Sequence, residues 1–357
     1  EGIQHYDINY LWIGNPYLTL YENTNSFNKN RILGNAALTY QLTDQLSVRV
    51  RSGTDVYNDA RAFRRAYSTN RKPYGGYRED NVGFREVNSD VLVTYADEMN
   101  RNLKYSISAG GNRFDQTTNY QYAEADQLAV PGVYTLENSR VPLTGTNNMY
   151  QKRINSIYAL GNFSYKTSFY LDLTFRNDWS STLPADNNSF GYYSANASYV
   201  FSNALDIEGS ILSYGKLRFS AASVGNDTDP YQLANSFVFN QNYGASFRVT
   251  NTSQLKNANL KPERLNALEL GTELWFVENK IQFDASIYQN TSINQIIGRP
   301  ISYASGFSNI VENGGEVRTR GIEAMLSAEI VNTGNFKWLS SVNFSTLKKV
   351  NKTFLNL

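Results

Sequence analysis

The sequence predicts an all-β fold, a transmembrane antiparallel β-barrel to which this chain contributes about twelve strands. Three observations predict this fold. Apolar and polar residues alternate with a period of two over many segments, which is the pattern of strands that present a different environment on each face. Short and long connections between these segments follow one another in alternation, and the polar face of several segments carries charged side chains.

The alternation is clear at residues 169–176, where four apolar side chains alternate with four polar or amphipathic ones. Equivalent segments predict strands at 31–43, 45–56, 84–97, 101–114, 151–166, 168–180, 189–202, 214–225, 263–277, 280–297, 310–332 and 336–351. Several of these exceed the roughly 9–11 residues that a strand needs to cross a bilayer. We therefore expect such strands to project beyond the membrane on one side.

The connections between the predicted strands alternate in length. Tight turns are expected near 43–44, 97–100, 166–167, 278–279 and 332–335. Long links are expected at 57–83, 115–150, 226–262 and 298–309, with intermediate ones near 181–188 and 203–213. In an up-and-down barrel alternate links lie on opposite rims, and outer-membrane barrels have short periplasmic turns and long external loops. The pattern therefore favours an outer-membrane barrel over a soluble sandwich.

The polar face of the predicted strands is charged. Its ionisable residues include Arg49, Arg51, Lys104, Arg176, Arg218, Glu269, Glu273, Asp284, Glu323 and Glu329. A dry core holds unpaired charges only at high cost, and a narrow barrel is packed with side chains. The sequence therefore predicts a wide barrel with a hydrated or filled lumen, in which twelve strands are only a part.

The composition fits this class and argues against several others. Aromatic residues make up 14% of the chain, with 26 Tyr and 19 Phe, which suits strands facing lipid on one side and water on the other. No apolar run reaches about 18 residues, so no transmembrane helix is expected. The net charge of +1 provides no field that would favour nucleic acid. With no cysteine and His5 as the single histidine, we expect no metal site and no cofactor.

No group of residues has the spacing of a catalytic site. Glu269 and Glu273 lie at strand spacing, which favours a lumen wall over general acid–base work. The glycine pairs lack the Lys-Ser/Thr of a phosphate loop and the strand–helix context that such a loop requires. We therefore expect the chain not to be an enzyme.

Two of the long links contain candidate contact residues for a ligand or a partner. In link 57–83 these are Arg61, Arg64, Arg65, Tyr67, Tyr74 and Tyr77. In link 226–262 they are Tyr231 and Tyr243. Aromatic faces can stack on sugars or peptide groups, and arginine forks can grip carboxylates. Packing of the loops over the barrel mouth, or against a partner protein, explains the same residues, and the sequence leaves these alternatives open.

Several segments carry a resemblance to a known family. They are Leu260-Lys261-Pro262-Glu263-Arg264, Asn313-Gly314-Gly315-Glu316-Val317-Arg318-Thr319-Arg320-Gly321-Ile322-Glu323 and Arg176-Asn177-Asp178-Trp179-Ser180-Ser181-Thr182-Leu183-Pro184. On these and related segments the chain resembles the SusC/RagA-like branch of TonB-dependent outer-membrane transporters of Bacteroidota. The resemblance covers nearly all of residues 31–357, and the matched segments look like barrel architecture, so no ligand residue is carried over.

The resemblance implies a barrel of about 22 strands in the bacterial outer membrane, filled by an N-terminal plug. Neither the plug nor a TonB box is found in this sequence, so we expect the chain to be an internal portion. Residues 1–30 are then expected to form a segment on the extracellular side, and residues 31–357 a partial barrel. The implied partners are TonB, acting through the absent plug, a SusD-like lipoprotein that closes the mouth, and outer-membrane lipid.

The function implied by the resemblance is the energy-coupled import of oligomeric nutrients, without chemistry on the substrate. Oligosaccharides (glycans) are the first expected ligand class and oligopeptides the second. The sequence also leaves open a non-transporting structural or docking subunit of a larger outer-membrane complex, and a soluble β-rich enzyme or adhesin.

Overall fold

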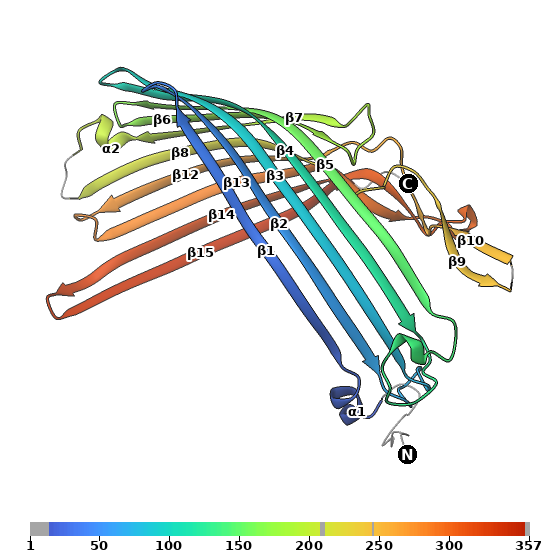
Figure 1. Cartoon of the computed structure of the whole chain (residues 1–357). Helices are drawn as coiled ribbons and strands as arrows, with labels where there is room; N and C mark the ends of the chain where they lie inside the picture. Colours follow the sequence, from blue (N-terminus) through green and yellow to red (C-terminus); the bar gives the residue numbers. More distant parts are fainter. Residues whose placement is uncertain (1–13, 208–210, 245, 354–357) are drawn as a thin grey trace.

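The computed structural model describes residues 14–207, 211–244 and 246–353. Its main feature is one curved antiparallel sheet, in which the long strands follow one another in chain order (Figure 1). The long strands are β1 (Asn25–Gln41), β2 (Leu46–Arg65), β3 (Gly76–Asn100), β4 (Leu103–Ala125), β5 (Thr144–Tyr165), β6 (Phe169–Ser180), β7 (Ser189–Val200), β8 (Leu212–Asn226), β12 (Glu263–Phe276), β13 (Ile281–Pro300), β14 (Asn309–Thr333) and β15 (Phe336–Thr353). The twelve predicted strands are thus confirmed.

The remaining elements are short. β9 (Phe237–Tyr243) and β10 (Ser246–Asn251) form a separate hairpin, and β11 (Gln254–Leu255) adds a short parallel pair to β14. The helical elements are α1 (Pro16–Tyr21), α2 (Phe201–Ala204), and the 3₁₀ turns η1 (Leu136–Asn138) and η2 (Tyr303–Ser305). Among the described residues, no helix has the length and apolar character that crossing a membrane requires.

The links between the strands lie on two opposite rims (Figure 1). The short-link rim, at the left of the figure, holds residues 42–45, 101–102, 166–168, 201–207, 277–280 and 334–335. The long-link rim, at the right, holds 66–75, 126–143, 181–188, 227–244, 246–262 and 301–308, together with α1. The predicted alternation of links between two rims is confirmed.

The two faces of the sheet differ in chemistry and in exposure. In β6, Phe169, Leu173 and Phe175 on one face are 40%, 41% and 50% exposed. Asp178 and Ser180 on the other face are buried. Directly paired residues of antiparallel strands share a face, so this assignment extends from strand to strand across the sheet. The convex face is apolar and the concave face is polar, as the alternation predicted.

The sheet forms an arc of a barrel. Strand β1 pairs only with β2, and β15 pairs only with β14, within the described residues. Both outer strands therefore present a row of backbone N–H and C=O groups that the arc itself leaves unpaired. The structure is a partial barrel, in agreement with the sequence prediction.

The predicted long link at 57–83 is wrong in its bounds. Residues Asn58–Arg65 continue β2, and they pair in register with Gly76–Gly83 of β3. The link predicted at 115–150 is also shorter in the structure, where it spans 126–143. Strand β1 begins at Asn25 rather than at residue 31. Backbone pairing does not need apolar side chains, so a strand that leaves the membrane loses its alternation without losing its hydrogen bonds.

We expect the two faces of β6 to tolerate charge very differently. An arginine replacing Leu173 should destabilise the assembled barrel by about 2–4 kcal/mol, because it places a charge on the lipid face near the middle of the apolar band. Arginine at the neighbouring Thr174 lies on the concave face and should cost less than half as much. Urea unfolding of the natural full-length protein in lipid vesicles measures both. Equal costs for the two variants would mean that the faces are assigned wrongly.

Candidate functional site

A small hydrophobic core organises the long-link rim beside β2, β3 and β4. Tyr77, Ala125 and Leu128 are buried together there, and Tyr134 and Leu136 pack against them. The first two belong to strand ends and the others to link 126–143, so the link is folded back onto the strands. We name Tyr77, Ala125, Leu128, Tyr134 and Leu136 the rim cluster. Six of the eight candidate contact residues lie in or beside it, in β2, β3 and link 66–75.

The three candidate arginines lie on β2 and not in a loop, which corrects the prediction. Arg61 makes an ion pair with Asp59 at 2.6 Å between Nη2 and Oδ2. Arg64 lies with its guanidinium 5.4 Å from the ring centroid of Tyr134. Arg65 donates a hydrogen bond of 3.0 Å to Oδ1 of Asn25. Each arginine thus has a partner within the rim, and Arg61 and Arg64 are also exposed to solvent.

The candidate tyrosines of this cluster are packed as well. Tyr67 and Tyr74, both in link 66–75, meet edge to face with ring centroids 6.2 Å apart. Tyr74 also carries the guanidinium of Arg140 over its ring at 4.3 Å. Tyr77 lies on β3, is only 9% exposed, and donates a hydrogen bond of 2.8 Å to Glu79. Tyr77 therefore anchors the rim, whereas Tyr67 and Tyr74 are half-buried and remain able to offer part of their rings to a ligand.

Lys72 joins the two links of the cluster. Its ammonium donates hydrogen bonds to Glu124, at 3.0 Å, and to Asp126. Burial works against the charged form, but these two hydrogen bonds outweigh it and raise the pKa of Lys72 above its usual range. The ammonium therefore stays charged at neutral pH and ties link 66–75 to the end of β4.

Tyr231 and Tyr243 do not join this cluster. Tyr231 is 52% exposed, its ring lies 6.2 Å from that of Tyr150, and its carbonyl accepts a hydrogen bond from Lys256. Tyr243 ends β9, and its side chain lies outside the described residues. The eight candidates therefore form one group of six, with Tyr231 elsewhere on the same rim.

The concave face near this rim holds a group that the loop-based prediction missed. Arg78 makes an ion pair with Asp80 at 2.6 Å, donates a hydrogen bond to the Tyr120 hydroxyl at 2.5 Å, and lies 4.1 Å from the Tyr122 ring centroid. Tyr120 and Tyr122 belong to β4, in a stretch that was predicted to be a link. Their two-residue spacing was the available signal, since it places both rings on one strand face.

Further down the concave face lies a cationic pocket of about 450 Å³. Its lining includes Arg49, Arg51, Lys152 and Arg176 but only one acid, Asp90. Arg51 pairs with Asp90 at 2.7 Å, and the Nε atom of Arg49 is buried without a hydrogen-bond partner in the described structure. We name these five residues the lumen patch. Its excess of charged donors suits it to bind carboxylates or other anionic groups.

Two partners from outside the pocket reduce that excess. Arg176 donates to Asp178 at 2.7 Å, and Lys152 pairs with Asp227 at 2.5 Å. The residue of the lumen patch with the least compensation is therefore Arg49, because Arg51 is paired with Asp90. In the described part of the chain, no group of three or more His, Cys, Asp or Glu side chains has the geometry to hold a metal ion.

Comparison with known proteins gives the same architecture. The family model for the TonB dependent receptor-like β-barrel matches residues 4–355. TonB-dependent receptor P26 of Formosa agariphila is 25% identical over 352 residues, covering 94% of this chain and 35% of that protein. Receptor P3 of the same organism is 22% identical over 369 residues, covering 96% and 35%. The chain thus spans about a third of the length of these curated relatives.

Two solved structures share the fold. A structure of the RagAB peptide transporter matches with a TM-score of 0.87 and 18% identity, covering 97% of this chain and 39% of that one. The ferric-catecholate import receptor Fiu of E. coli matches with a TM-score of 0.57 and 12% identity, covering 94% and 49%. At these identities the likeness concerns the fold alone.

We expect replacement of Lys72 by methionine to loosen the rim cluster without unfolding the barrel. Link 126–143 should be cut several-fold faster by trypsin at Arg140, while the global stability should fall by about 1 kcal/mol or less, the range of a partly exposed ion pair. Limited proteolysis followed by mass spectrometry measures the first effect. Methionine at Lys256, a cation of another link, serves as the control, and unchanged cutting at Arg140 in the Lys72 variant would contradict the assignment.

Proposed function

The chain belongs to the TonB-dependent receptor-like β-barrel family, and on that premise we propose that it forms part of the wall of an importer of oligomeric nutrients. Barrels of this family lie in the bacterial outer membrane. The observation that carries the proposal is the pairing of an apolar convex face with a charged concave face around a wide arc. A wall of this kind separates lipid from a hydrated conduit.

TonB supplies the energy in this proposal, acting on a plug that fills the lumen. The lumen patch supports the idea, because it places four cations and only one acid on the concave face, and Arg49 has no acidic partner among the described residues. Such residues are suited to hold anionic groups of a plug or of a passing ligand. No covalent chemistry on the substrate is part of the proposal.

The long-link rim is the extracellular one in this proposal, since outer-membrane barrels carry their long loops outside. Asn23, which precedes β1, accepts hydrogen bonds from Ala66 and Thr69 of the rim. This contact supports the assignment of the region before β1 to the extracellular side. The rim cluster would then receive a ligand, or a SusD-like lipoprotein that closes the mouth.

The ligand is an oligosaccharide in the first version of this proposal and an oligopeptide in the second. The edge-to-face pair of Tyr67 and Tyr74 supports the first, because aromatic faces stack on sugar rings. The exposed Arg61 and Arg64 support the second, because guanidinium groups bind peptide carboxylates. RagAB, whose fold this chain shares, is described as a peptide transporter, which also favours the second version.

Deleting the gene in its natural host should abolish growth on the cognate oligomers while growth on the corresponding monomers continues. Purified oligosaccharide mixtures and peptide digests, each supplied as the limiting nutrient, separate the two ligand classes. A protonophore should stop uptake of labelled oligomer, because TonB coupling needs the proton gradient. Normal growth on every oligomer would instead favour a structural or docking subunit.

Glutamine at both Arg49 and Arg51 should lower the uptake of anionic oligomers by at least about tenfold, because two charge-assisted hydrogen-bond donors are lost. Surface abundance and heat-modifiable mobility should stay normal, since charged lumen residues do not carry the fold. Glutamine at Lys104 is the matched control, because it removes a cation from the same face outside the patch. An equal effect of the control would show that the patch has no special role.

A further inference from the structure

On the convex face of β13, β14 and β15, side chains become polar between one register row and the next. One row of register partners runs Phe219, Leu270, Ile287, Ile322 and Thr346, from β8 to β15. The next row on the same face, two residues nearer the long-link rim, runs Ala221, Leu268, Gln289, Arg320 and Lys348. On β8 and β12 the second row remains apolar, whereas on β13, β14 and β15 it places an amide and two cations next to Ile287, Ile322 and Thr346.

A similar change occurs on β4 and β5, in another part of the sheet. On β4 and β5, Gly111 pairs with Ile157 in the apolar band, and the next row on that face pairs Arg113 with Asn155. Because both groups of strands change character toward the long-link rim, we infer that these positions mark the edge of the hydrocarbon region on the extracellular side. Arg320 and Lys348 therefore lie at the depth of lipid headgroups.

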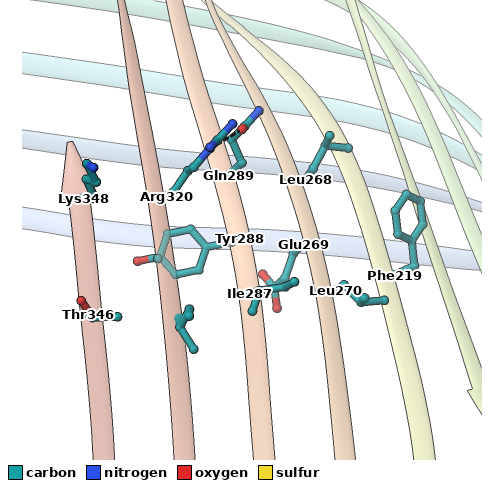
Figure 2. A pocket seen from close by; sticks show the side chains of 12 residues that line it. Phe219, Leu268, Glu269, Leu270, Ile287, Tyr288, Gln289, Arg320, Thr346 and Lys348 are labelled. Carbon is teal, nitrogen blue, oxygen red and sulfur yellow. Dashed lines mark hydrogen bonds between the residues drawn. The ribbon is translucent and has the colours of Figure 1, made fainter. Parts of the chain in front are cut away.

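A pocket of about 530 Å³ spans these two rows (Figure 2). Arg320, Gln289 and Lys348 lie in the upper part of the view, Leu270 and Ile287 lie below them, and Phe219 lies at the right. The side chains of Phe219, Leu270 and Ile287 are 49%, 52% and 52% exposed, so they are open to whatever surrounds the barrel. The pocket thus combines a cationic end with an apolar end.

The two cations lack compensation from the protein. Arg320 and Lys348 are direct register partners on neighbouring strands, and like charges placed in this way repel each other. Arg320 donates a hydrogen bond of 2.8 Å to the neutral Gln289. Neither cation forms an ion pair with a carboxylate of the described residues.

The acids nearest in sequence belong elsewhere. Glu269 and Glu323 lie on the rows of the concave face, one residue out of phase with the cations. Arg318, the next cation on the convex face of β14, is paired with Glu316 at 3.0 Å. The position therefore holds two adjacent and uncompensated positive charges directly above an apolar surface.

We propose that this pocket is a specific site for an acylated lipid with a phosphorylated headgroup, from the outer leaflet of the membrane. The phosphate accepts hydrogen bonds from Arg320 and Lys348 and removes their mutual repulsion. An acyl chain lies along Phe219, Leu270, Ile287 and Ile322. The site depends on the membrane location of the barrel and is independent of what the barrel transports.

Native mass spectrometry of the natural full-length protein tests the site. The probes are dioleoyl phosphatidic acid and dioleoylglycerol, which share acyl chains and differ in the phosphate. Wild-type protein should bind the phosphatidic acid at least about tenfold more tightly. The R320Q/K348Q variant should lose this binding by roughly 30-fold, since each basic side chain near an anionic lipid surface contributes about a factor of five.

The matched control is K261Q/K349Q, which removes two positive charges from an extracellular link and from the residue next to Lys348 on the opposite face. It should change lipid binding by less than about twofold. The R320K/K348R variant keeps both charges and should bind like wild type. Variants that fold are recognised by heat-modifiable mobility, and K348Q alone, about fivefold weaker, decides the matter if the double variant does not assemble.

Four results would overturn the proposal. The first is equal loss in R320Q/K348Q and in the control, and the second is equal binding of the two lipids. The third is a lipid-independent dimer that R320Q/K348Q dissociates, which would assign the pocket to a second copy of the protein. Loss of binding in R320K/K348R would also contradict it, because the charges would then not be the determinant.

Discussion

The antiparallel hydrogen-bond ladder is the interaction on which the rest of this structure depends. In lipid, each backbone N–H and C=O group must be satisfied within the protein, which leaves closed barrels as the only strand-based solution. Because paired residues share a face, the ladder sorts side chains into rows. Arg51 meets Asp90 on the concave face, and Val50 meets Val91 on the convex face, one step away. The polar concave face and the apolar convex face thus both follow from the same strand register.

The ladder also sets where the candidate ligand contacts are held. Strands β2 to β5 continue past the apolar band, so that Arg61 and Arg64 are carried on paired backbone. The links then fold back onto the strand ends, where Tyr77 and Leu128 are buried. A contact surface built in this way is largely preorganised, since little loop ordering remains to be done when a ligand or a lipoprotein binds. The arginines nevertheless have internal partners, and a ligand must compete with these or add to them.

Strand bounds could be predicted from the sequence where the two faces of a strand meet different surroundings. They could not be predicted as well where both faces meet similar surroundings. Residues 169–176 alternate between lipid and lumen, and β6 was predicted within one residue of its bounds. Residues 58–65 face water on both sides, so the periodic signal disappears although the hydrogen bonds to β3 continue. The rim cluster was hidden for another reason: Tyr77, Ala125 and Leu128 come from two strands and a link. Their meeting depends on strand register and on how a link folds back, and neither follows from local pattern.

The charged side chains of the two faces differ in whether they have partners of opposite charge within the protein. On the concave face, Arg218 holds Asp284 at 2.8 Å and Arg176 holds Asp178 at 2.7 Å, as expected for groups that must remain stable beside a conduit. On the convex face, Arg320 and Lys348 are register partners, and neither forms an ion pair with a carboxylate of the described residues. A phosphate-bearing lipid surface can supply the missing negative charge there, whereas neutral solvent cannot. Because the two faces share only the backbone, the lumen patch and the lipid site can be altered separately.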